Sequence, residues 1–181
     1  MNPGVAFFGD SSGAVYAFTL VASDNGCTQQ DRQSIPGYAV VAGPIVLANG
    51  SADEVYVLAS NGTDSRLVHF TYRNGSLSNS GSLHLPWPNA AGLALETTGL
   101  PARLAITFAG GEVEVDQIQK SFGMKRLSNT ALAVTIAHAP SWYHSSSTDL
   151  IGIGGQTGTG GGMLVVLDSN LNSVGTFAVP A

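Results

Sequence analysis

The chain has 181 residues, enough for one domain with its own core, and only 10% of them are charged. The net charge is −5 and the few Lys and Arg residues are scattered singly, which argues against nucleic-acid binding, because that needs clustered cations. The longest apolar stretch, Tyr38–Ala48, has eleven residues, whereas a membrane-spanning helix needs about 20. We therefore expect no nucleic-acid partner and no transmembrane segment.

Pairs of apolar runs separated by short turns recur along the chain. Each pair consists of an apolar run, a turn rich in Gly, Ser, Asp or Asn, and a second, alternating run. In chain order the pairs are Val5–Gly9 with Ala14–Leu20, Glu54–Ala59 with Arg66–Tyr72, Leu104–Ala109 with Glu112–Gln117, and Leu150–Gly154 with Met163–Asp168. Corresponding runs lie roughly 45 to 52 residues apart, a period that is typical of β-propeller blades when only strands repeat.

Dividing the chain at its turns gives four blades, roughly 1–36, 37–88, 89–129 and 130–181, within a single propeller domain, whole or partial, over 1–181. The first blade has room for three strands, since too few residues remain in front of Val5 to form a fourth. The strands predicted for the other blades are Ala39–Ala48, Glu54–Ala59, Arg66–Tyr72 and Ser80–Leu85; Gly92–Thr97, Arg103–Ala109, Glu112–Gln117 and Met124–Ser128; and Thr130–Ala139, Asp149–Gly154, Met163–Asp168 and Val174–Val179. We predict an all-β fold of antiparallel four-stranded blades, the first incomplete, with about fifteen strands in all and almost no helix.

Alternation within the strands predicts which side chains form the core between blades. Over Glu112–Gln117, two valines alternate with three carboxylates, which predicts one buried face and one face in water. The residues that recur at equivalent buried positions are Val55, Val57, Val68, Phe70, Leu104, Ile106, Val113, Val115, Ile151, Ile153, Val165 and Leu167.

Four features that could carry chemistry are better explained as structure. Gly9–Gly13 superficially resembles the nucleophile region of trypsin-like proteases, but it lies between two apolar runs and is predicted to be a hairpin turn. Gly154–Gly162 lacks the Lys of a phosphate-binding loop and is predicted to be a long hairpin loop. The four histidines are predicted to be isolated, and Cys27 to lie in a loop between blades. The sequence thus predicts no catalytic, cofactor or metal site.

A family resemblance lies in the first strand pair, over Phe7–Phe18. After an apolar strand and a Gly/Ser/Asp turn, the segment resembles the Gly-x-Leu/Val-Tyr-Ala-Phe/Leu core of a pyrroloquinoline-quinone-type propeller repeat, through Gly13, Val15, Tyr16, Ala17 and Phe18. Met163–Asp168 and Leu67–Phe70 resemble the same repeat more loosely. The resemblance implies a propeller of the quinoprotein, or PQQ-repeat-like, superfamily with about four blades. These blades would form either the whole propeller or part of a larger one.

Two connections rich in aromatic residues are candidates for a partner surface. They contain Trp87, between two prolines, and Trp142 and Tyr143, after Pro140. Trp and Tyr are enriched at binding surfaces, but propellers also use such residues to wedge blades together, and both interpretations stay open here.

Few charges, repeated blades and an incomplete first blade favour a non-enzymatic protein-interaction or structural module without a cofactor. Its missing elements would come from a protein partner or from further blades, giving a ring that does not close by itself. The low Lys content predicts an extracellular, cell-surface or periplasmic location. The alternatives are a fragment of a quinone-dependent dehydrogenase, which the family resemblance implies, and a closed four-bladed ring similar to haemopexin-like domains.

Overall fold

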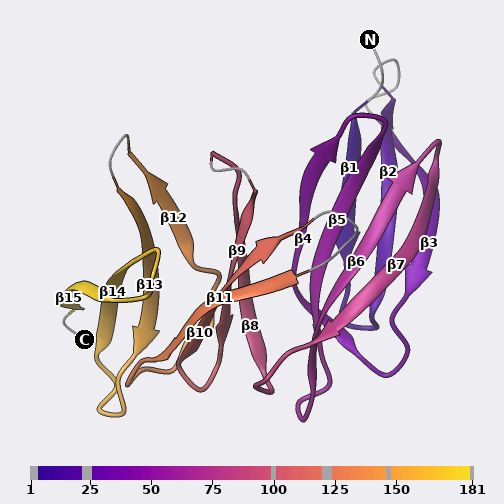
Figure 1. Cartoon of the computed structure of the whole chain (residues 1–181). Coiled ribbons are helices and arrows are strands. Elements are labelled where there is room, and N and C mark those ends of the chain that lie inside the picture. The colour runs from indigo at the N-terminus through magenta and orange to yellow at the C-terminus, as the bar shows by residue number, and fades with distance from the viewer. Residues whose placement is uncertain (1–3, 22–25, 99–100, 120–123, 146–147, 180–181) are drawn as a thin grey trace. The chain divides into compact units, whose positions relative to one another are not determined.

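The computed structural model describes residues 4–21, 26–98, 101–119, 124–145 and 148–179, which form fifteen β-strands and no helix (Figure 1). In this part of the chain there is accordingly no helix that could cross a membrane. The strands belong to four antiparallel sheets, one of three strands and three of four strands. The predicted all-β architecture of propeller blades with a shorter first blade is confirmed. The chain divides into two compact units, Met1–Leu85 and Pro86–Ala181, which are described separately.

The first unit contains two sheets whose strands pair in chain order. The first sheet consists of β1 (Val5–Gly9), β2 (Ala14–Val21) and β3 (Gly26–Ser34), and the second of β4 (Ala39–Asn49), β5 (Ala52–Ser60), β6 (Ser65–Arg73) and β7 (Ser76–His84). Strand β1 contacts β4, and β3 contacts β7, so the two sheets lie face to face with their first and last strands matched. This arrangement is that of neighbouring propeller blades.

The second unit repeats this plan with two sheets of four strands. Its sheets consist of β8 (Ala90–Glu96), β9 (Arg103–Phe108), β10 (Glu112–Ile118) and β11 (Met124–Ala131), and of β12 (Ser141–His144), β13 (Asp149–Gln156), β14 (Gly162–Asp168) and β15 (Ser173–Val179). The strands again pair in chain order, and β8 contacts β12. Hairpin connections throughout explain why every pairing is antiparallel.

Each unit has an apolar core between its two sheets. The core of the first unit comprises Val15, Ala17, Ile35, Val55, Val57, Ala59, Val68, Phe70, Tyr72 and Leu77. The core of the second comprises Ala105, Val113, Val115, Val134, Ile136, Ile151, Ile153, Val165, Leu167 and Leu171. Ten of the twelve predicted core residues belong to these clusters, and the other two, Leu104 and Ile106, are also fully buried. The register inferred from alternation is therefore confirmed for the ten residues in the clusters. Leu104 and Ile106 pair with Asp116 and Glu114, so they are buried on the opposite face of the third sheet from Val113 and Val115, and it is Ala105 that belongs to the core of the second unit.

Turn chemistry fixes the hairpins where the backbone needs positive φ. Asn74 and Gly75, with φ of 52° and 84°, join β6 to β7, as the Asn-Gly pair predicts. Gly13, with φ of 81°, ends the turn between β1 and β2, and a Cβ there would lie 2.1 Å from the carbonyl oxygen of Tyr38. Only glycine fits this position, because both the conformation and the close backbone exclude a side chain.

The predicted first strand of the fourth sheet, Thr130–Ala139, is wrong. Thr130 and Ala131 are the last residues of β11, and the first strand of the fourth sheet is β12, from Ser141. The apolar alternation that suggested a strand has another cause: Val134 and Ile136 are buried in the core of the second unit while the backbone forms a single bridge, between Thr135 and Gln156.

Three smaller predictions are also corrected. The carboxylates of β10 do not form a wet face, because Glu114 and Asp116 are buried. The glycine-rich segment is not a long loop, since β13 and β14 pair as far as Gln156 and Gly162. Cys27 is exposed within strand β3 rather than in a loop.

Candidate interaction surface

Strands β1 and β2 of the first sheet carry apolar or aromatic side chains on both faces, whereas β3 is polar. One face packs on the second sheet through Val15 and Ala17. The other face carries Phe8, which is 55% exposed and whose ring contacts that of Phe18 edge to face at 5.6 Å. Phe8 pairs with Tyr16 across the β1–β2 ladder, so these aromatic side chains share one face. We call this aromatic surface of β1 and β2 the N-terminal outer face.

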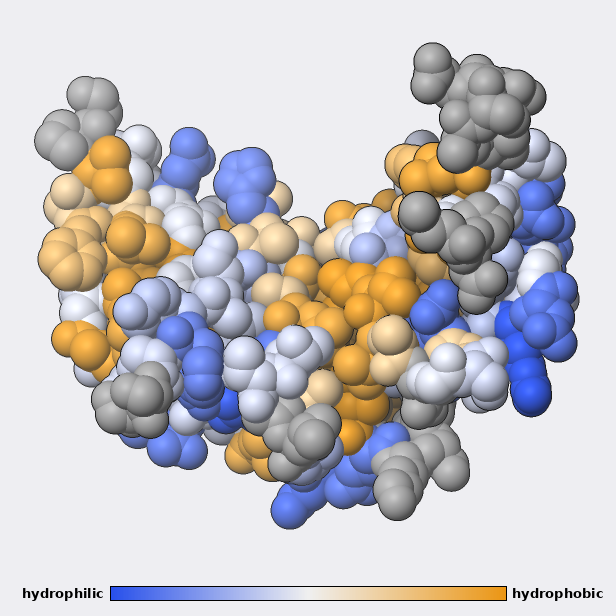
Figure 2. All heavy atoms as spheres, turned by 90° about the horizontal axis from the view of Figure 1, so that it is seen from above, coloured by the Kyte–Doolittle hydropathy of each residue, from blue (hydrophilic) through white to orange (hydrophobic). Residues whose placement is uncertain are grey.

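The fourth sheet has a second exposed apolar face. Val165 and Leu167 pack into the core on one side of β14. On the other side Leu164 pairs with Phe177 of β15, which is 58% exposed, and Val179 is exposed beside them. Hydrophobic side chains gather over this C-terminal sheet, at the left of the view in Figure 2. We call this surface of β14 and β15 the C-terminal outer face.

The first sheet also has an open edge. Its strand order is β1-β2-β3, so no described strand pairs with β1 on the side away from β2. The other three sheets each have a further strand at this position, namely β4, β8 and β12. Unpaired backbone N–H and C=O groups on an edge are a template for another strand.

The three predicted partner residues lie in different surroundings. Trp87 packs edge to face on Phe108, with ring centroids 5.3 Å apart. Trp142 donates its indole N–H to the carbonyl oxygen of Ala94, at 3.3 Å. The contact of Trp87 lies at one end of the β8–β9 ladder, where Ala90 pairs with Phe108, whereas Ala94 lies in the other half of the ladder, paired with Ala105.

Tyr143 differs from both tryptophans in being exposed. It is 62% exposed and, by strand alternation, points to the opposite side of β12 from Trp142. It therefore belongs to the side of the fourth sheet that bears the C-terminal outer face. Whether any of the three contacts a partner stays a prediction.

A charged cluster joins the third and fourth sheets beside Trp142. The Arg103 guanidinium forms ion pairs with the carboxylates of Glu96 and Asp149 and lies 5.2 Å from the centroid of the Trp142 ring. His144 also contacts Asp149. Hydrogen bonds from Arg103 and His144 lower the pKa of Asp149. The residues come from four strands of two sheets, so no spacing in the sequence identifies the cluster. The one available signal was that each charged residue is at the end of a predicted or observed strand.

The sequence predicted isolated histidines, but two of the others are paired with carboxylates. His69 bonds the Glu54 carboxylate and stacks on Tyr56, with ring centroids 4.8 Å apart. Burial lowers the pKa of His69 and outweighs the opposing effect of Glu54. His84 lies 2.8 Å from a carboxylate oxygen of Asp64. These pairs lie within one sheet and stabilise strand pairing; in the described residues no group of three or more His, Cys, Asp or Glu could hold a metal ion.

Two buried carboxyl groups lie side by side on β10. Arg126 donates to Glu114 at 2.8 Å, whereas neither carboxyl oxygen of Asp116 has a hydrogen-bond partner within the part of the chain that the structure describes. Burial, and then the negative charge of Glu114, raise the pKa of Asp116 to about 7. Sequence alternation identified the carboxylates but placed them in water.

The segment that resembles a protease motif is a hairpin turn, as predicted. Asp10 accepts hydrogen bonds from Ser12 and from the backbone N–H of Ala14. These bonds, led by that of the Ser12 side chain, lower the pKa of Asp10 to about 2. The carboxylate therefore closes the turn as an ionised acceptor, and Ser12 donates to it rather than to a general base.

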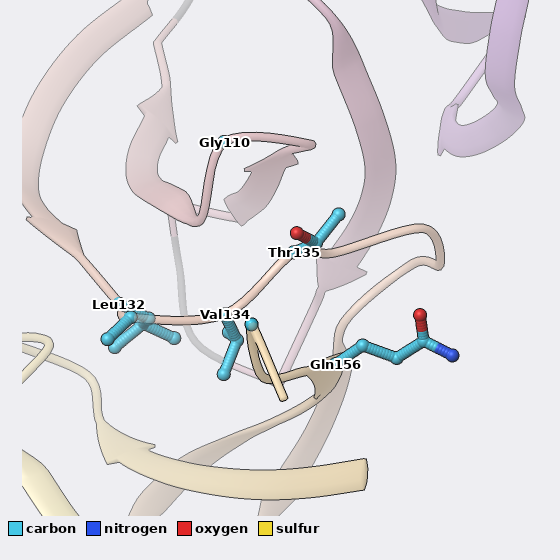
Figure 3. Close-up of a pocket in the computed structure, with 7 residues that line it drawn as sticks. Gly110, Leu132, Val134, Thr135 and Gln156 are labelled. Carbon is cyan, nitrogen blue, oxygen red and sulfur yellow. The ribbon is translucent and has the colours of Figure 1, made fainter. Parts of the chain in front are cut away.

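A hollow of about 240 Å³ lies where the chain crosses from the third to the fourth sheet (Figure 3). It is lined by Gly110, Leu132, Ala133, Val134, Thr135, Gln156 and Gly158. None of these side chains titrates near neutral pH, and the volume is smaller than the roughly 300 Å³ lower limit of ordinary ligand pockets. The side chains of Val134 and Thr135 point to opposite sides of the crossing segment. The hollow has no groups for acid–base chemistry.

The repeated four-stranded meanders define a β-propeller, and solved structures show the same fold. The chain is similar to Sqt1 of Saccharomyces cerevisiae, at 12% identity and a TM-score of 0.68 over 97% of this chain and 48% of that one. It is also similar to BBS1N, crystallised in complex with ARL6DN, at 15% identity and a TM-score of 0.64 over 97% of this chain and 50% of that one. The chain thus spans about half the length of these structures. No protein-family model and no curated protein matches the sequence.

Proposed function

We propose that the chain is a non-enzymatic protein-interaction module, a partial β-propeller that a partner chain or further blades complete. The observation that carries the proposal is the pair of outer faces. In the two terminal sheets, strands β1, β2 and β14 carry apolar side chains on both sides, yet only one side packs on a neighbouring sheet. A propeller blade in a ring packs on two neighbours, which accounts for this double-sided composition.

The open edge of β1 and the structural comparisons support the same proposal. An edge strand without a neighbour is a place where another strand can pair. The similar structures are about twice as long as this chain, so a chain of this length corresponds to about half of such a protein. One of them, BBS1N, was crystallised with a protein partner, ARL6DN. On these grounds we assign protein partners rather than a small-molecule substrate.

The proposed location is outside the cytoplasm, at the cell surface, in the periplasm or secreted. It rests on composition: 10% of residues are charged, and only two of these residues, Lys120 and Lys125, are lysines. Fractionation of the native host, with antibodies against the chain, tests the location independently of the interaction.

The interaction proposal is tested by association of the full chain through its outer faces. Native mass spectrometry over a range of concentrations is expected to show self-association of the wild-type chain. Association removes the exposed apolar faces of the chains from water. The double variant Leu164→Ser and Phe177→Ser is expected to weaken association at least about tenfold. Leu127→Ser is the matched control: Leu127 is 41% exposed but belongs to the third sheet.

Equal weakening by the control variant would show that any exposed apolar side chain matters, and would remove the outer face as the cause. A wild-type chain that stays monomeric at every concentration, with no binding of a hydrophobic dye, would contradict the proposal.

A further inference from the structure

The two outer faces are opposite sides of their sheets in chain order. The first sheet packs on the sheet that follows it, through Val15 and Ala17, and the fourth sheet packs on the sheet that precedes it, through Val165 and Leu167. Each core therefore joins the following side of one sheet to the preceding side of the next. The N-terminal outer face is a preceding side and the C-terminal outer face a following side, so together they form the combination that both cores use.

Within each core the following side contributes the smaller side chains. The third strands of the sheets show this, with Val15 and Ala17 against Val68 and Phe70 in the first unit, and Val113 and Val115 against Val165 and Leu167 in the second. Phe7 on β1 is larger, but it is only partly buried. Small residues that face large ones allow two layers to interdigitate at close packing. Sheets of this protein thus fit when a following side of small residues meets a preceding side of large ones.

The N-terminal outer face, a preceding side, carries large side chains. Phe8 of β1 and Tyr16, Phe18 and Leu20 of β2 share this face by strand alternation. The rings of Tyr16 and Phe18 lie 6.1 Å apart, and that of Phe8 contacts Phe18. The rings therefore form one continuous aromatic surface.

The C-terminal outer face, a following side, has little bulk over β13. Gly152 pairs with Val166, and Gly154 with Leu164. A Cβ added at Gly154 would meet no atom of the described residues within 4 Å. A mostly apolar cavity of about 390 Å³ opens beside Gly154 and Leu164, larger than the roughly 150 Å³ that is enough to hold a benzene ring. Phe177, the large side chain of this face, lies at its margin on the last strand, β15. The face is therefore hollow where the N-terminal outer face is bulky.

The lengths of the similar structures favour a second copy of this chain as the occupant of these faces. The match covers 97% of this chain and 48% of Sqt1 or 50% of BBS1N, so two copies have about the length of one such propeller. A contact between unlike faces either closes into a ring or continues as a filament. The length relation favours closure after two copies.

We propose that two copies of this chain associate head to tail, with the N-terminal outer face of each packed on the C-terminal outer face of the other. The aromatic rings of Phe8 and Phe18 enter the hollow beside Gly154, and the contact repeats the large-on-small packing of the two cores. Twofold symmetry makes the two contacts equal, so all four outer faces are covered. The inference rests on the proposed interaction function and names its partner and the faces that meet.

The first test fills the hollow while adding apolar surface. Gly154→Leu adds a leucine side chain to the C-terminal outer face of the full chain, so association driven by apolar area alone would be as strong as in wild type or stronger. Head-to-tail packing predicts wild-type dimers and at least about tenfold weaker association of the variant, because the hollow is overpacked. Gly158→Leu, in the turn after β13 and also in open space, is the matched control and is expected to dimerise like wild type. Native mass spectrometry over a range of concentrations measures all three.

The second test identifies which faces meet. One variant carries Phe8→Ser and Phe18→Ser, and the other carries Leu164→Ser and Phe177→Ser. Each variant alone has one altered face in both contacts and is expected to be mostly monomeric. Their mixture is expected to form heterodimers, identified by mass, because one of the two contacts then joins two unaltered faces. Either variant dimerising alone like wild type would mean that like faces pair, and would overturn the proposal.

The behaviour of the wild-type chain separates this inference from the interaction proposal. A chain that is monomeric at every concentration but binds a hydrophobic dye would overturn the second copy as the occupant and leave the interaction proposal standing. Open-ended association beyond the dimer would overturn the closed pair in the same way. A monomeric chain without dye binding would contradict both.

Discussion

The first strands of the second and fourth sheets show two ways in which a strand can accommodate more residues than the strand with which it pairs. Strand β4 pairs with β5 over its full length, from Ala39↔Ser60 to Asn49↔Ala52, and takes up extra residues as irregularities near Ala42 and Ile45. In the fourth sheet the extra residues, 136–140, leave the sheet as a departing segment and pack on the third. The comparison teaches that surplus residues can be absorbed within the strand, as in β4, or can leave the sheet when a neighbouring sheet provides hydrogen bonds and an apolar core for them.

The largest effect is expected where the fourth sheet is held to the third. Replacing Arg103 by Met would leave the buried carboxylate of Glu96 and the carboxylate of Asp149 without their cation. Breaking a buried ion pair costs about 3–5 kcal/mol. Urea denaturation of the variant should show a loss of this size. Replacing Arg66 by Met, in the more exposed pair with Asp64, is the control and should cost less than about 1 kcal/mol.

A loss of similar or slightly smaller size is expected from truncating the departing segment. Ile136→Ala removes a fully buried side chain from the core of the second unit and should cost about 2–5 kcal/mol. Val46→Ala, at a partly exposed position on β4, should cost less than about 1 kcal/mol. Equal losses would mean that the departing segment is no better packed than an ordinary first strand, and the contrast between the two sheets would fail.

An intermediate effect is expected at the glycine where the segment meets β8. A Cβ at Gly92 would clash with the backbone of His138 and Ala139, so Gly92→Ala should cost about 1–3 kcal/mol as overpacking does. Gly154→Ala adds its Cβ to open space and should change the free energy of unfolding by less than about 0.5 kcal/mol. A thermal melt of both variants checks the pair, and a stable Gly92→Ala would show that the segment can move off β8.

The smallest effect is expected from pH. Arg103 and His144 depress the pKa of Asp149, so the folded state favours its ionised form. Stability from this group is present above the unfolded pKa, about 3.9, and is lost as pH falls below it. The free energy of unfolding should therefore decrease more steeply below about pH 4 in wild type than in Arg103→Met. Parallel pH profiles of the two proteins would show that the ion pair adds nothing beyond packing.

Local pattern was sufficient for most of the fold. Alternation in strands such as Leu150–Gly154 and Met163–Asp168 predicted their existence and buried faces, because side-chain direction in a strand has a period of two. Turn residues such as Asn74 and Gly75 marked the hairpins, because positive φ is a local requirement. The resemblance to PQQ-type repeats rests on one segment and stays a prediction.

Only the tertiary structure decided where apolar residues leave a sheet, which carboxylates are buried and which aromatic residues are exposed. Val134 and Ile136 alternate like a strand but are buried against another sheet, and Glu114 and Asp116 alternate like a wet face but are covered. Trp142 and Tyr143 are neighbours in the sequence, yet one packs over Arg103 and the other is exposed. The physical reason is common to all: a strand's pattern determines which side chains share a face, whereas the neighbouring sheet determines what that face meets.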